Sequence, residues 1–168
     1  MNNISLKSWS LETRVIDLIQ EIGQLFDDCN LCYGHGTEHP LDEAAALVLF
    51  VLGIDYLDVE EPSFSQVSAV EFKLIEKLVD QRIQERKPLP FLTQEAFFCG
   101  YKFYVDERVL IPRSPMAELI QKQFEPWIDS ASVERVLDVA TGSGCLAVAI
   151  AKNFPGTEVV ASDVSEEA

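Results

Sequence analysis

The sequence predicts an α/β protein in two parts, a helical bundle at the N-terminus and the beginning of a doubly wound parallel sheet at the C-terminus. Two observations lead to this prediction. Apolar residues recur at helical spacing through residues 1–90, whereas residues 135–163 read as strand, glycine turn, helix and strand in that order. The 168 residues are 48% hydrophobic and 24% charged, a balance typical of globular proteins that allows one or two small domains.

Three helices are predicted in residues 1–90. Ser10 is a candidate N-cap for the first, whose apolar residues run from Val15 to Phe26. The second extends from Pro40 to Gly53, and its nearly continuous apolar run predicts burial. The third ends before Pro88, because the residue before a proline disfavours the helical region. Its apolar positions are Val67, Val70, Leu74, Ile75, Leu78 and Ile83. We interpret these stripes as core and not as a ligand site.

The charge is strongly acidic and unevenly distributed. The formal net charge is −15, which argues against direct nucleic-acid binding through phosphate neutralisation. Between Val15 and Phe72 there is no Lys or Arg, but there are twelve carboxylates. This acidic face is either a solvated surface or a docking surface for a basic macromolecule. The longest apolar run, 44–52, is far shorter than the roughly 20 residues that cross a bilayer, and no secretory signal is evident. We therefore expect a cytoplasmic protein.

The cysteines do not predict a metal centre or a disulfide. Cys29 and Cys32 precede His35 and His39 in the pattern Cys-x2-Cys-x2-His-x3-His. A zinc finger places about a dozen residues between its two ligand pairs so that the chain wraps the ion, and two residues do not suffice. A redox pair is the other alternative, but ordinary half-buried thiols are the favoured interpretation.

A β-hairpin is predicted after the helices. Residues 96–98 and 101–105 flank Cys99-Gly100, a two-residue turn with glycine available for positive φ. Ser114 as N-cap and Pro115 at the first helical position then predict a helix through Phe124. The stretch from residue 94 to 113 is thus interpreted as a connector between two domains.

The strongest local pattern is one βαβ unit. Residues 135–139 form a predicted buried strand, 140–144 a tight turn, 145–152 a helix, and 158–162 a second strand that ends at Asp163. Glycines in the turn let a ligand approach the backbone, and the helix N-terminus offers free N–H groups. Asp163 stands where a carboxylate accepts from ribose hydroxyls.

Two nucleoside cofactors are compatible with this unit, and a ligand-free structural turn is a third alternative. The pattern Gly142-x-Gly144-x-x-Ala147, with Asp163 following Gly142 by 21 residues, fits the spacing expected for NAD. Asp138 favours S-adenosylmethionine, because a carboxylate there repels a pyrophosphate but attracts the ammonium of the aminoacyl end.

The motifs resemble a known family. Residues 138–144, Asp-Val-Ala-Thr-Gly-Ser-Gly, together with 163–165 resemble the cofactor motifs of class I methyltransferases. Residues 98–113 resemble the hairpin and loop of HemK-type protein-glutamine methyltransferases. Residues 33–37 and 113–119 are similar to the branch that modifies the third protein of the large ribosomal subunit. The resemblance implies transfer of a methyl group from S-adenosylmethionine to a glutamine side-chain amide of that ribosomal protein.

The resemblance also implies a domain plan and a cofactor site. We expect a helical substrate-docking domain at 1–90, a hairpin and loop at 91–114, and an incomplete, Rossmann-like methyltransferase domain at 115–168. The cofactor-binding candidates are Asp138, Ala140, Thr141, Gly142, Ser143, Gly144 and Asp163. We expect a monomer with a ribosomal protein as substrate, without direct nucleic-acid or membrane binding.

Substrate-pocket candidates lie before the βαβ unit. The resemblance suggests that Phe103, Arg113 and Ser114 line the glutamine pocket. From the residues alone, a packing role in the hairpin is favoured for Phe103, and Arg113 is as readily a surface ion-pair partner. His35 either contacts the substrate or bonds to its own loop.

The chain departs from the family in two ways. Ala140 replaces the first glycine of the methyltransferase motif. The Asn-Pro-Pro-Tyr loop with which the family holds its amide is absent, since no Asn-Pro occurs in the sequence. We therefore assign no catalytic residue, expect the chain to be a truncated form, and expect these 168 residues to be inactive by themselves. The alternatives are a non-catalytic acidic binding module for a basic ribosomal protein and an NAD-dependent enzyme.

Overall fold

Helices come first along the chain and short strands follow, so the mixture of elements agrees with the predicted α/β class. The computed structural model describes residues 13–34, 36–54 and 67–168. It divides the chain into two compact units, Met1–Thr93 and Gln94–Ala168, which we call the helical unit and the α/β unit. No helix among the described residues is long and apolar enough to cross a membrane.

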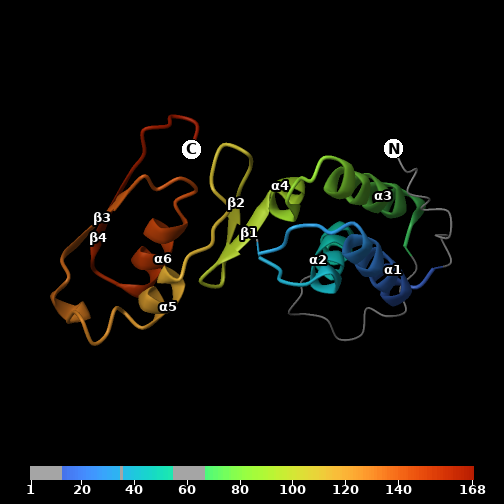
Figure 1. Cartoon of the computed structure of the whole chain (residues 1–168). Helices are drawn as coiled ribbons and strands as arrows, with labels where there is room; N and C mark the ends of the chain where they lie inside the picture. The colour runs from blue at the N-terminus through green and yellow to red at the C-terminus, as the bar shows by residue number, and fades with distance from the viewer. Residues whose placement is uncertain (1–12, 35, 55–66) are drawn as a thin grey trace. The chain divides into compact units, whose positions relative to one another are not determined.

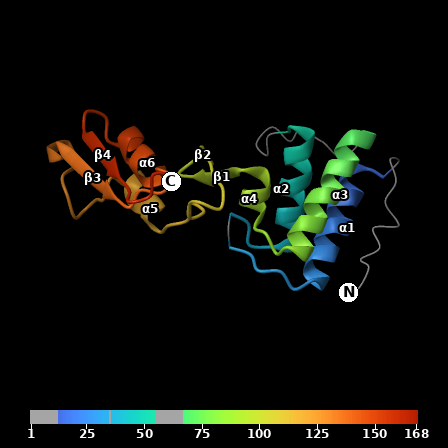
Figure 2. The same ribbon diagram turned by 90° about the horizontal axis from the view of Figure 1, so that it is seen from above.

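In the described part of the helical unit there are four helices, α1 to α4 (Figures 1 and 2). The second packs against each of the other three. Their bounds are Val15–Asp28 for α1, Pro40–Leu52 for α2, Ala69–Gln84 for α3 and Leu89–Thr93 for α4. The short α4 was not predicted. Because apolar residues recur every three to four positions, each of the long helices turns one stripe into a shared core.

The core confirms most positions of the predicted stripes and corrects some in each long helix: Ile16 of α1 and Phe50 of α2 are both 37% exposed. Leu18, Ile22 and Phe26 of α1 are completely buried, as their helical spacing predicted. Val70 and Leu74 of α3 were expected to belong to the buried stripe, but both are exposed, and Val70 is 80% exposed. They lie outside the sector of α3 that faces the core, which is formed by Ile75, Leu78, Val79 and Ile83.

The helix ends show which of the predicted capping residues begin or end a helix. The predicted cap Ser10 lies outside the described residues, and α1 begins at Val15 after Arg14, which makes no side-chain capping bond. Helix α2 has the predicted bounds, with Gly53 in the left-handed conformation at its end. Helix α3 begins with a capping box, in which Ser68 and Glu71 each bond to the other's backbone N–H.

One carboxylate of the predicted acidic face is buried. Glu43 of α2 forms an ion pair with Arg82 of α3, and both side chains are about 3% exposed. The Arg82 guanidinium also donates to the Cys32 carbonyl at 2.8 Å, and the Thr37 hydroxyl donates to Glu43 at 3.2 Å. Glu43 is therefore no part of the acidic surface: with Arg82 it fixes the loop after α1 onto α2 and α3.

The α/β unit begins with the predicted hairpin. Strands β1, Glu95–Phe98, and β2, Tyr101–Tyr104, pair antiparallel around Cys99-Gly100. Both turn residues have positive φ, 51° and 81°, as a two-residue turn between twisted strands requires. The prediction of this hairpin is confirmed.

The helix after the hairpin is shorter than predicted. Helix α5 covers Met116–Gln121 and does not reach Phe124, because Gln123 and Phe124 have positive φ, which an α-helix excludes. Pro115 stands at the N-cap position, while the Ser114 hydroxyl accepts from the Met116 N–H at 3.2 Å. The sequence signal therefore located the start of this helix but not its end.

The predicted βαβ unit is confirmed. Strands β3, Arg135–Val139, and β4, Glu158–Ser162, pair in parallel, and α6, Cys145–Asn153, connects them. Helix α6 contacts both strands and is itself covered by α5 (Figure 1).

The prediction that residues 135–139 form a buried strand was wrong. Only one face of this two-stranded sheet packs against α6, and the side chains of Leu137 and Val139 on the other face are 62% and 69% exposed. Val160, the register partner of Leu137, is also exposed.

Candidate functional site

The candidate site lies where β3 and β4 both end. Because the strands are parallel, their carboxyl ends meet at the same edge of the sheet. Two hydrogen bonds, each donated by a backbone N–H group, attach the turn after β3 to the end of β4. The Thr141 N–H donates to the Ser162 carbonyl at 3.0 Å, and the Gly142 N–H donates to the Asp163 carboxylate at 2.8 Å. The turn is thus anchored to the neighbouring strand before any ligand is considered.

Positive φ angles shape the turn. Gly142 and Gly144 have φ of 53° and 74°, and a Cβ built on either would meet no atom within 4 Å. Glycine is therefore required there by backbone conformation and not by crowding. Ala140 also has a positive φ, 60°, which costs an L-residue roughly 1–2 kcal/mol. The family's glycine would adopt this angle without that cost.

The two predicted carboxylates occupy different environments. The Asp163 carboxylate accepts from the backbone N–H groups of Ser165 and Gly142, and these bonds hold its pKa below the ordinary value of 3.8. Asp138 is half-buried, and its Oδ2 accepts from the Thr141 hydroxyl at 2.6 Å. Two carboxylate acceptors therefore flank the turn, Asp163 on the β4 side and Asp138 on the β3 side.

Free N–H groups complete the site. Helix α6 begins at Cys145 directly after Gly144, and no side chain caps it. Its first intrahelical bond runs from the Val148 N–H to the Gly144 carbonyl at 2.9 Å. Within the described residues, the N–H groups of Cys145, Leu146 and Ala147 make no hydrogen bond, so this first turn of α6 remains available to an anionic group of a ligand. Ser143 is half-buried within the turn.

Sequence reasoning missed two contributors, Ser162 and Ser165, which act through their backbone groups. The Ser165 contact had a recognisable signal, because Asp-x-Ser is the spacing at which an aspartate accepts from the N–H two residues later. The Ser162 contact depends on the pairing of β3 with β4 and has no local signal.

The substrate-pocket candidates are dispersed within the α/β unit. Phe103 is 9% exposed and belongs to the buried face of the hairpin. Arg113 is exposed, and Ser114 is engaged at the start of α5. Within the described residues, no hydrogen bond joins either of them to the turn at 140–144. His35 lies outside the described residues, and the four cysteines are free thiols.

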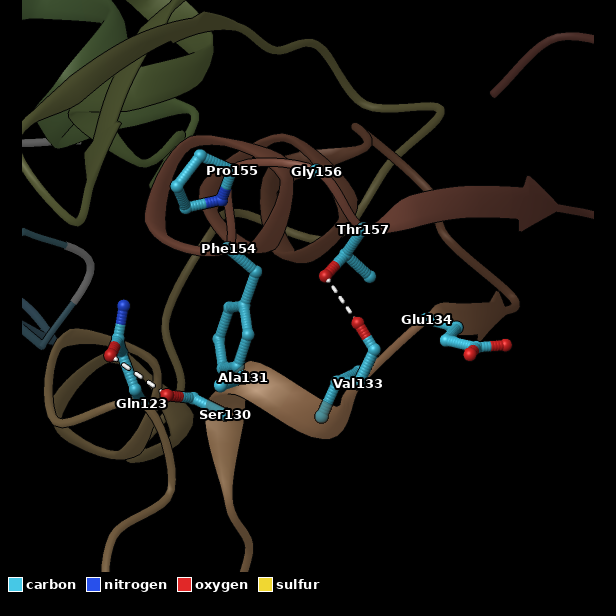
Figure 3. A pocket seen from close by; sticks show the side chains of 9 residues that line it. All are labelled: Gln123, Ser130, Ala131, Val133, Glu134, Phe154, Pro155, Gly156 and Thr157. Atoms are coloured by element: carbon cyan, nitrogen blue, oxygen red, sulfur yellow. Dashed lines mark hydrogen bonds between the residues drawn. The ribbon is translucent and has the colours of Figure 1, made fainter.

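A pocket of about 380 Å³ lies at the opposite, amino ends of the strands (Figure 3). Three of its polar side chains, those of Gln123, Ser130 and Thr157, already bond to the protein. Ser130 donates to Gln123 at 3.1 Å, Thr157 donates to the Val133 carbonyl at 2.8 Å, and the Glu134 carboxylate points away from the Phe154 ring. We therefore assign the functional site to the carboxyl ends of the strands and not to this pocket.

A strand, a glycine turn, an uncapped helix N-terminus and a carboxylate after the second strand are together typical of nucleoside-binding sites. No protein-family model matches the chain. The chain is 40% identical over 156 residues, 92% of its length, to curated proteins named ribosomal protein uL3 glutamine methyltransferase from Xylella fastidiosa (strain Temecula1) and Xanthomonas campestris pv. campestris. A third such relative comes from Xylella fastidiosa strain 9a5c.

These relatives confirm the resemblance that the motifs predicted: all three are named as glutamine methyltransferases. The chain spans about half the length of these relatives, covering 49% and 50% of the first two.

Proposed function

We propose that this chain forms the cofactor-binding and substrate-docking part of an S-adenosylmethionine-dependent methyltransferase that acts on a glutamine side-chain amide of ribosomal protein uL3. The observation that carries the proposal is the 40% identity, over 92% of the chain, to relatives that bear this name. The proposed fold of residues 115–168 is the first part of a Rossmann-like class I domain. Because the substrate is ribosomal, we propose a cytoplasmic location.

The donor and acceptor groups of the site fit this cofactor. Asp163 is an ionised acceptor beside the turn, suited to the ribose hydroxyls. Asp138 is an acceptor on the β3 side, suited to the ammonium of the aminoacyl end, and the N–H groups at the start of α6 suit its carboxylate. A pyrophosphate would instead bring negative charge close to Asp138.

The residues of this chain bind and orient, and they do not perform the transfer. When bound, S-adenosylmethionine supplies an electrophilic methyl group on a sulfonium centre. Asp138 and Asp163 would hold the two ends of the cofactor, so that the direction of that methyl group is fixed relative to the turn. An amide nitrogen is a poor nucleophile and needs hydrogen-bond acceptors that position it. The chain has no Asn-Pro-Pro-Tyr segment to supply them.

Calorimetry tests the cofactor assignment. The 168-residue chain is titrated with S-adenosylmethionine and, separately, with NAD. We expect binding of the first and an Asp163→Ala variant weakened about tenfold or more, because charge-assisted hydrogen bonds contribute roughly 1.5–3 kcal/mol. Unchanged affinity in the variant would remove Asp163 from the site. Preferential binding of NAD would overturn the cofactor assignment.

A methyl-transfer assay tests whether the chain binds and orients the cofactor without performing the transfer. With labelled S-adenosylmethionine and purified uL3, we expect no transfer by these 168 residues by themselves, because the sequence has no Asn-Pro-Pro-Tyr segment to position the amide. Labelled uL3 in this assay would show that the chain contains a catalytic residue that we have not identified.

The acidic surface of the helical unit supports a basic protein as the partner. Asp27, Asp28 and Asp42 are exposed on α1 and α2, and no Lys or Arg lies between Val15 and Phe72. Four more carboxylates of the predicted face, Asp55, Asp58, Glu60 and Glu61, lie outside the described residues. A uL3-type substrate that carries net positive charge would be steered to this surface by electrostatic attraction.

Stopped-flow association with uL3 tests the docking surface. The on-rate should fall as salt shortens the Debye length from about 10 Å at 0.1 M to about 3 Å at 1 M. Reversal of Asp27, Asp28 and Asp42 to lysine should lower the on-rate and leave S-adenosylmethionine affinity unchanged. On-rates that are indifferent to salt and to charge reversal would reduce the acidic surface to a solubility feature.

A further inference from the structure

The hydroxyl of Thr141 is held more rigidly than an ordinary turn side chain. The Thr141 N–H donates to the Ser162 carbonyl at 3.0 Å, and the Thr141 carbonyl accepts from the Gly144 N–H at 3.0 Å. The backbone of this residue is thus fixed from both sides. A β-branched side chain has few allowed χ1 rotamers, so the position of the hydroxyl follows from the position of the backbone.

This hydroxyl makes one directed bond. It donates its single proton to Oδ2 of Asp138 at 2.6 Å, within the short range of hydrogen bonds to a carboxylate. Within the described residues, no hydrogen bond to Oδ1 of Asp138 is recorded. The bond therefore selects one rotation of the carboxylate and leaves its other oxygen, together with the lone pairs of the hydroxyl, as acceptors.

We propose that Thr141 is a positioning residue: its hydroxyl orients the Asp138 carboxylate toward the ammonium of the cofactor's aminoacyl end. The inference rests on the proposed function, because it concerns the same cofactor site. Its distinctive consequence is selectivity. Loss of the hydroxyl weakens ligands that carry the aminoacyl end and spares ligands that share only the adenosine part, whose ribose is assigned to Asp163.

Matched variants and matched ligands test the inference. Thr141→Val keeps the size and branching of the side chain and removes the hydroxyl, whereas Thr141→Ser retains it. Each variant of the 168-residue chain is titrated calorimetrically with S-adenosylmethionine and with 5′-methylthioadenosine, which lacks the aminoacyl end. Thr141→Val should weaken S-adenosylmethionine about tenfold and change methylthioadenosine affinity less than about twofold. Thr141→Ser should restore most of the loss.

The outcomes distinguish failure of the inference about Thr141 from failure of the proposed cofactor site on which it rests. If the unaltered chain binds neither ligand, the proposed cofactor site fails and the inference fails with it. If it binds both ligands and Thr141→Val changes neither affinity, or weakens both equally, only the inference is overturned. An equal loss would mean that the side chain supports the turn as a whole. Binding of methylthioadenosine alone by the unaltered chain would also overturn it, since Asp138 would then meet no ammonium.

Discussion

The two units of this chain differ in how completely they bury their apolar side chains. In the helical unit, each long helix turns its apolar stripe into a core shared with its neighbours, and Leu18, Ile22 and Phe26 are completely buried. In the α/β unit, α6 covers one face of the β3–β4 sheet, while Leu137 and Val139 on the other face are largely exposed. A parallel sheet ordinarily has both faces covered, but a helix needs only one covered stripe. Equivalent substitutions should therefore have unequal effects in the two units.

The largest difference is expected for ion pairs. Arg82→Met should destabilise the helical unit by about 3–5 kcal/mol, because Glu43 is left buried without its partner. Arg135→Met should cost the α/β unit less than about 1 kcal/mol, because its 2.8 Å pair with Glu158 is exposed. Urea unfolding followed by hydrogen exchange of amides in each unit measures both values. The double variant Arg82→Met, Glu43→Met should recover most of the loss, and a failure to recover it would contradict the desolvation argument.

Leucine truncation gives the next largest difference. Leu18→Ala should destabilise the helical unit by about 3 kcal/mol, since it removes buried methyl groups and leaves a cavity. Leu137→Ala should change the stability of the α/β unit by less than about 0.5 kcal/mol, because its side chain is already 62% exposed. The same exchange experiment compares them. A large effect of Leu137→Ala would show that something covers this face in solution.

Glycine-to-alanine substitutions distinguish a stability cost that comes from a crowded Cβ position from one that comes from a positive backbone φ. A Cβ on Gly23 of α1 would lie 3.1 Å from the Leu41 backbone of α2, so Gly23→Ala should cost about 1–2 kcal/mol despite alanine's better helix propensity. Gly142→Ala meets open space, and its cost of about 1 kcal/mol should come from its positive φ. Leu41→Ala removes the Leu41 Cδ1 contact, also at 3.1 Å, but keeps the backbone contact, so it should relieve the first substitution only in part when the two are combined. No paired substitution is expected to relieve the second.

The smallest expected effect is a local dependence on pH in the α/β unit. Backbone N–H groups of Ser165 and Gly142 lower the pKa of Asp163, so the carboxylate's stabilising contribution is complete above the unfolded pKa of about 3.9. It is lost as the pH falls through the lower folded pKa. The Gly142 amide resonance, followed by NMR from pH 6 to pH 2, should shift as its bond to Asp163 weakens. In Asp163→Asn the resonance should not show this titration.

Much of the candidate site was predictable because its signals are local. The bounds of β3 and β4, the positive-φ glycines of the turn, and the carboxylates Asp138 and Asp163 follow from residues adjacent in the chain. The resemblance to glutamine methyltransferases also rested on these short motifs. The contacts of the carboxylates did not follow in the same way, because the bond from Gly142 to Asp163 joins residues 21 positions apart.

The positions of the principal elements follow from local sequence patterns, which predicted the ends of α2, the hairpin turn at Cys99-Gly100, and the βαβ unit with its glycine turn. These features depend on the φ preferences of glycine and proline and on hydrophobic periodicity, which act between near neighbours. The tertiary structure alone decided which stripes are covered and which charges are paired. Glu43 and Arg82 are 39 residues apart, and nothing in either neighbourhood distinguishes a buried pair from two surface charges. Burial is a property of the surfaces that meet, and those surfaces come from distant parts of the chain.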